Sequence, residues 1–130
     1  MALPGMTPVG SLEIQVTGLR SAKGVLQFCI ARDAGDFPDC REGASGIKHT
    51  VSAAAPNLRF ETLPQGNYAV AVIHDANANA KLDTMLGIPK EGFGFSRNPA
   101  IRFGPPRFDA ARFALGGGGA VQKIRMRYML

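Results

Sequence analysis

The sequence is poor in the side chains that most often bind transition metals. It contains two cysteines and two histidines among its 130 residues. A zinc site usually needs four nitrogen or sulfur donors, in pairs only a few residues apart. Cys29 and Cys40 lie too far apart for such a pair, and the spacing of His49 and His74 does not indicate contact. The composition therefore gives no support to a zinc site.

Longer patterns with a known chemistry are missing as well. No apolar run approaches the ~20 residues of a membrane-spanning helix, and residues 1–10 lack the regions of a signal peptide. There is no serine elbow, cysteine–histidine pattern, phosphate loop or nucleic-acid motif, and no interleaved aromatic stacking surface. We expect no transmembrane segment and no nucleic-acid partner, and we assign residues 1–10 to a disordered or leader-derived N-terminus.

Acidic residues are scarce in the C-terminal part of the chain. The net charge is +5, and from residue 97 onward the only acidic side chain is Asp109. A basic end of this kind can serve nucleic acid, acidic glycans or a membrane surface. Because no motif accompanies the charge, we interpret it as the solvated face of a strand. The basic residues are Arg97, Arg102, Arg107, Arg112, Lys123, Arg125 and Arg127.

The residues that are present predict one all-β domain over residues 11–130. Apolar residues make up 45% and charged residues 19%, which excludes general disorder. The 16 glycines and 9 prolines favour short elements joined by tight turns. A chain of this size can bury roughly two-thirds of its unfolded surface. Turn signals between alternating runs predict a single antiparallel β-sandwich of seven to eight strands, without a helix.

Alternation of apolar and polar residues locates the strands. Residues 11–18 alternate as a half-buried strand does, and we expect them to pair antiparallel with residues 24–32. Residues 68–73, YAVAVI, are apolar on both faces, which is typical of a strand covered on both sides. We expect residues 116–119 to form a hairpin connection. The other predicted strands are residues 47–55, 57–63, 100–103, 107–115 and 121–128.

Cys29 and Cys40 flank part of an irregular polar loop, residues 33–46. We interpret them as a disulfide that closes this loop; two separate thiols are the alternative. A disulfide indicates an oxidising compartment, which in a bacterium is the periplasm or the cell exterior. Phe37, followed by Pro38, is expected to pin the loop to the core.

The stretch from His74 to Ser96 abandons all periodicity after the apolar run. A long loop inside a compact domain is usually functional or disordered. Its first part matches positions 1, 3, 5, 7 and 9 of an EF-hand-type calcium loop, the seventh ligand being a backbone carbonyl. Those positions hold Asp75, Asn77, Asn79, Lys81 and Asp83.

Two departures weaken the match to a calcium loop. Ala80 stands where a glycine is usual, and Leu86 where a bidentate glutamate is usual. Glu91 supplies the missing carboxylate if the loop folds back. Calcium is the preferred ion and magnesium the weaker candidate, because magnesium keeps several waters. The alternatives are a set of Asx turns without a metal, or a different ligand.

His74 raises a second hypothesis, a hydrolase-type enzyme that uses His74, Asp75 and Glu91. General acid–base catalysis requires these three side chains to converge on one pocket. Otherwise we interpret His74 as a structural residue at a strand end. We interpret His49 as an exposed or hydrogen-bonded structural residue.

Two segments of the chain resemble the signature of a bacterial family, the domain of unknown function 2141. They are residues 63–83, LPQGNYAVAVIHDANANAKLD, and residues 87–96, GIPKEGFGFS. The Phe37–Pro38 pair is also similar to the family. The resemblance implies a transthyretin-like (prealbumin-like) β-sandwich and export from the cytoplasm, which supports the disulfide. It implies no particular activity.

We therefore expect an exported, non-catalytic β-sandwich binding module that is periplasmic or secreted. Its partner would be a glycan, a protein or a small molecule. The hydrolase and a purely structural envelope protein are the alternatives. The predicted ligand-binding residues are His74, Pro89, Glu91, Phe93 and Phe95.

Overall fold

The computed structural model describes residues 7–40, 46–77, 91–101 and 104–129, and the backbone pairing of residues 84–85 with 88–89. The elements are β1 (Val9–Thr17), β2 (Val25–Ala31), β3 (Ile47–Ser52), β4 (Leu58–Pro64), β5 (Gly66–Asp75), β6 (Thr84–Met85), β7 (Ile88–Pro89), β8 (Gly92–Phe95), α1 (Phe108–Ala111), β9 (Phe113–Leu115) and β10 (Ala120–Arg125).

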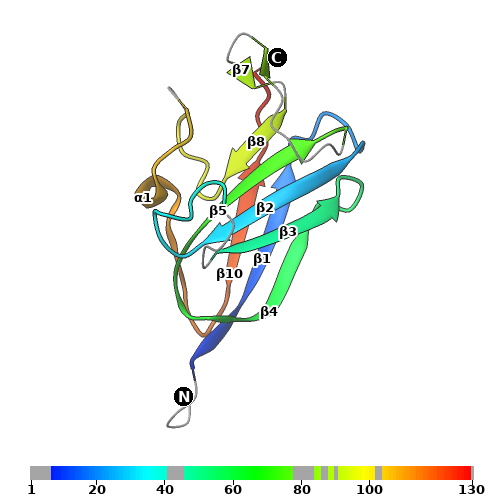
Figure 1. Ribbon diagram of the computed structural model, residues 1–130. Coiled ribbons are helices and arrows are strands. Elements are labelled where there is room, and N and C mark those ends of the chain that lie inside the picture. The colour runs from blue at the N-terminus through cyan, green and yellow to red at the C-terminus, as the bar shows by residue number, and fades with distance from the viewer. Residues whose placement is uncertain are drawn as a thin grey trace.

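Two sheets pack face to face as a β-sandwich (Figure 1). One is three-stranded in the order β10-β1-β4, and the other is five-stranded, with β3-β2-β5-β8 in sequence and β9 paired to β5. This confirms the predicted all-β sandwich. In the described part of the chain, no helix has the length and apolar character needed to cross a membrane.

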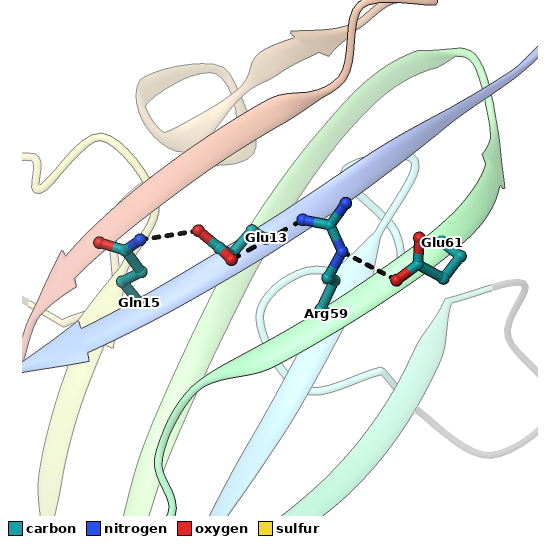
Figure 2. Close-up of polar contacts among 4 residues, drawn as sticks. All are labelled: Glu13, Gln15, Arg59 and Glu61. Carbon is teal, nitrogen blue, oxygen red and sulfur yellow. Dashed lines mark hydrogen bonds and ion pairs between the residues drawn. The ribbon is translucent and has the colours of Figure 1, made fainter.

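The interior of the sandwich is built from alternate residues of the strands. Leu12, Ile14 and Val16 of β1 are buried, and the polar side chains between them point outward. On that outer face, Glu13 accepts a hydrogen bond from Gln15 at 2.7 Å and lies 3.7 Å from Arg59 (Figure 2). Arg59 also donates to Glu61 at 2.9 Å, and the hydrogen bond and charge of Glu61 raise the pKa of Arg59. The half-buried strand predicted for residues 11–18 is therefore confirmed for β1.

β5 is buried on both faces, as its apolar run predicts. Tyr68, Val70 and Val72 face the sandwich interior. Ala69 and Ala71 face the outside of the sheet, where a second apolar cluster covers them. The other buried members of that outer cluster are Cys29, Ala31, Phe37, Cys40, Phe95 and Ala111.

The loop after β2 supplies much of this outer cover. Cys29 and Cys40 form the predicted disulfide, with their Cα atoms 5.5 Å apart. The ring of Phe37 lies edge-on to Phe95 and Phe108, at centroid distances of 5.9 and 6.1 Å. Phe37 thus pins the loop to the core, as predicted.

Several predicted pairings are wrong. β1 does not pair with β2; it lies between β4, antiparallel, and β10, parallel. Residues 116–119 connect β9 to β10, which lie in different sheets, so they form no hairpin. The reason is that alternation along a strand determines which face is buried, but it carries no information about the neighbouring strand.

The boundaries of several elements also differ from the prediction. β1 begins at Val9, inside the segment assigned to the N-terminus. The predicted strand over residues 107–115 is a short helix, α1, followed by β9. Ala100 and Ile101 are not in a strand, and residues 102–103 lie outside the described residues. Within the predicted loop after β5, residues 92–95 form β8, which pairs with β5.

We predict that replacing both cysteines by alanine lowers the free energy of unfolding by about 3 kcal/mol, because the cross-link restricts the unfolded chain. Urea denaturation of the oxidised protein and the double variant measures the difference. Mass spectrometry after alkylation provides the control: the native protein should have no reactive thiol. Equal stability of the two proteins, or two alkylated thiols, would contradict the prediction.

Candidate functional site

The candidate site lies where β5 ends beside the beginning of β8, and we call it the β5–β8 end (Figure 1). The paired residues His74 and Gly92 form the last step of that ladder. Asp75 and Glu91 follow at the next step, so the register brings two carboxylates to neighbouring strands. Asp75 is fully buried and Glu91 is 5% exposed.

Asp75 is held by the neighbouring strand β2. Gln27 pairs with Ile73 in the β2–β5 ladder, so its side chain lies on the same face of the sheet as that of Asp75. The Gln27 amide donates a hydrogen bond of 3.0 Å to Asp75 Oδ2. Gly24, at φ +73°, passes so close that a Cβ there would overlap the Asp75 carbonyl oxygen. Asp75 is therefore fixed by the sheet itself.

Glu91 reaches back to the beginning of the loop. Its Oε2 accepts a hydrogen bond of 3.2 Å from the backbone N–H of Ala76. Glu91 therefore lies next to the beginning of the loop, which its predicted role as an additional carboxylate ligand needs. Ionised carboxylates that are brought to the same place repel each other, and a bound cation lowers that repulsion. The geometry of Asp75 and Glu91 is therefore compatible with a divalent cation at the base of the loop.

His74 points the opposite way, into the sandwich interior, and is 1% exposed. Its Nε2 lies 2.8 Å from the Lys23 carbonyl, which can only accept, so Nε2 carries the proton. Nδ1, 2.8 Å from the Tyr128 hydroxyl, then accepts from that hydroxyl. Both ring nitrogens are thus engaged inside the protein, which fits the structural interpretation of His74 better than ligand binding.

Tyr128 connects the end of the chain to this network. Its hydroxyl also accepts from the Arg20 backbone N–H at 3.2 Å, and the Arg20 guanidinium lies 4.4 Å from the ring centroid. A Cβ at Gly92 would overlap the Tyr128 ring, so β8 needs glycine at this point. Alternation predicts that Tyr128 faces inward, but no signal in the sequence pairs it with His74.

The structure describes some of the other predicted site residues fully, one through its backbone alone, and others not at all. Phe93 is half-buried on the outer face of β8, and Phe95 is buried against Phe37. Pro89 is described only through its backbone pairing with Thr84. Asn79, Lys81 and Asp83 lie outside the described residues. His49 is exposed, as expected, with its ring 5.8 Å from that of Phe60.

The calcium loop therefore stays a prediction. Asp75 and Asn77 are the two of its five ligands that the structure describes. Among the described residues, no group of three or more histidine, cysteine, aspartate or glutamate side chains could hold a metal ion. The structure places Asp75 and Glu91 at the base of the loop, and the remaining ligands are those predicted from the sequence.

We predict that Tyr128→Phe lowers the free energy of unfolding by about 1–3 kcal/mol, because it leaves the buried His74 Nδ1 without its donor. Chemical denaturation measures the change. Tyr68→Phe is the matched control, because it also removes a tyrosine hydroxyl. The Tyr68 hydroxyl donates a 2.6 Å hydrogen bond to the Pro64 carbonyl and does not touch His74. Nuclear magnetic resonance of His74 should show the Nε2-protonated tautomer in the native protein; the Nδ1 tautomer would contradict the assignment.

Comparison with known proteins gives one match. The profile of a family described as an uncharacterized protein conserved in bacteria (DUF2141) matches residues 14–123, which include the β5–β8 end. No curated protein and no solved structure matches the chain. The match covers most of the sandwich and agrees with the resemblance of residues 63–83 and 87–96. The chain therefore belongs to the DUF2141 family of uncharacterized bacterial proteins.

Proposed function

We propose that this protein is a non-catalytic binding module that acts in the periplasm or outside the cell, with a calcium-dependent loop at the β5–β8 end. The observation that carries the proposal is that His74 and Asp75 lie on opposite faces of β5. This separation supports a role of the two residues in binding over a joint role in proton transfer.

The hydrolase hypothesis needs His74, Asp75 and Glu91 in one pocket. Successive side chains of a strand point to opposite faces, so the sheet separates His74 from Asp75. His74 bonds to Tyr128 in the sandwich interior, whereas Asp75 bonds to Gln27 on the outer face. The required convergence is therefore not met, and this favours binding over catalysis.

The two carboxylates at the base of the loop favour a cation as part of the binding site. Asp75 and Glu91 are both buried, and each already has one hydrogen bond that fixes an oxygen atom. Calcium accepts carboxylate, amide and carbonyl oxygens together, which is the set predicted in the sequence from Asp75 to Asp83. Two or three carboxylates correspond to a site of modest affinity. In this proposal the ion would connect the end of β5 to the beginning of β8.

The disulfide supports the proposed compartment. Cys29 and Cys40 close the loop that covers the outer face of β5, and both are buried. Disulfides of this structural kind persist in oxidising compartments.

The polar outer face around Glu13 and Arg59 fits a domain whose three-stranded sheet is exposed to water.

The test is a calcium titration of metal-stripped protein by calorimetry, with thermal melting alongside. We expect saturable heat and a higher melting temperature, because an ion that binds only the native state stabilises it by about 2.7 kcal/mol at 100 times its Kd. Asp75→Asn and Glu91→Gln should lose both signals. Glu61→Gln, an exposed carboxylate on the other sheet, is the matched control and should keep them.

Three results would contradict the proposed calcium site or change it. No heat and no melting shift at millimolar calcium would remove calcium from the proposal and leave the loop as an Asx-turn scaffold. An equal loss in Glu61→Gln would show that the signal reports net charge alone. Loss in Asp75→Asn but not in Glu91→Gln would place the ion away from β8.

A further inference from the structure

We propose that an anionic polysaccharide binds along the groove between β8 and β10. We call this the β8–β10 groove; it is lined by Phe93, Pro99, Ile101, Arg125 and Arg127, among others. The inference names the partner class of the proposed binding module and rests on that proposal. It uses different residues from the calcium-dependent loop, so the two can fail separately.

The groove lies where the two sheets are joined along one side. Phe93 and Arg127 exchange two backbone hydrogen bonds, of 2.9 and 2.8 Å, between β8 and the segment after β10. Asn98, at φ 46°, donates from its amide to the Lys123 carbonyl and accepts from the Arg125 N–H, both at 2.9 Å. These four bonds fix the distance between the walls of the groove, so the surface is preorganised.

The segment from Lys123 to Arg127 carries a row of positive charge, of which Arg125 and Arg127 line the groove. Lys123, Arg125 and Arg127 are exposed at every second position, which places them about 7 Å apart along the strand. Among the described residues none of the three forms an ion pair, whereas Arg59 and Arg112 do. Within the part of the chain that the structure describes, no carboxylate neutralises this row. A polyanion is the partner whose charge matches such a row.

The rest of the groove is apolar and too small to enclose a ligand. Phe93, Pro99 and Ile101 are half-buried along it. Its hollow has a volume of about 10 Å³, roughly the space of one water molecule. A partner must therefore lie along the surface. A charged sugar chain suits this shape, because its C–H faces pack against apolar side chains while its carboxylate or sulfate groups take bidentate bonds from arginine.

The aromatic residues favour a polysaccharide over single-stranded nucleic acid. Stacking of bases needs open ring faces. The Phe93 ring is half-buried with its centroid 6.0 Å from that of Phe95, and the Arg20 guanidinium lies over the Tyr128 ring. Among the described residues, Phe93 is thus the one aromatic ring of the groove that is partly open, which is less than a series of stacked bases needs, whereas a sugar chain needs only apolar contact with it.

The experiment measures binding of heparin and of polygalacturonate, a sulfated and a carboxylated probe, by calorimetry at two salt concentrations. We expect saturable binding that weakens with salt. Arg125→Gln combined with Arg127→Gln should weaken it at least about tenfold, since each guanidinium makes charge-assisted hydrogen bonds. Arg125→Lys combined with Arg127→Lys keeps the charge but loses the bidentate geometry, and should bind with intermediate affinity.

The matched control is Lys48→Gln combined with Arg59→Gln, which removes two exposed cations from β3 and β4. It should bind as the native protein does, and thermal melting should show that all variants fold. Equal weakening in the control, no binding of either probe, or tighter binding of single-stranded DNA or of anionic vesicles would overturn the inference. Polysaccharide binding that persists in Asp75→Asn would show that the groove functions without the calcium site.

Discussion

Burial of β5 on both faces is the constraint on which the rest of the structure depends. Val70 and Val72 need the sandwich interior on one side, and Ala69 and Ala71 need a second cover on the other. The loop closed by the disulfide, together with β8 and α1, provides that second cover. Because these elements fix β5 from every side, its last residues are held rigidly, and the candidate site begins at that end.

This arrangement explains why neighbouring residues of one strand have separate roles. His74 belongs to the sandwich interior and ties β5 to the C-terminal segment through Tyr128. Asp75 belongs to the outer face and is supported by β2 through Gln27. Glu91, the residue before β8, contacts the same end through the Ala76 N–H. Successive side chains of β5 point to opposite faces of the sheet, and both faces are covered. His74 can therefore stabilise the sandwich interior while Asp75, the next residue, lies at the base of a surface loop.

Much of this fold was predictable from local patterns, and the rest depends on contacts that local patterns do not encode. Alternation identified β1, β2 and β4 and the inward-facing side chains of β1 and β2, and the run YAVAVI identified the doubly covered strand. The parallel pairing of β1 with β10 was not predictable, because the alternation along one strand does not say which strand lies beside it. In the candidate site, the spacing of Asp75 and Asn77 predicted a loop that begins where β5 ends. The partners Gln27 and Tyr128 come from distant strands and were not predicted.

The pairing of β1 with β10 also has a consequence for how the protein folds. Leu12 of β1 lies opposite Ala120 of β10, so two strands that are far apart in the sequence are neighbours in the sheet. Contacts between positions so far apart form slowly, because a long loop must close first. The three-stranded sheet is complete only when β10 has docked on β1, and we expect that long-range contact to limit the rate of folding.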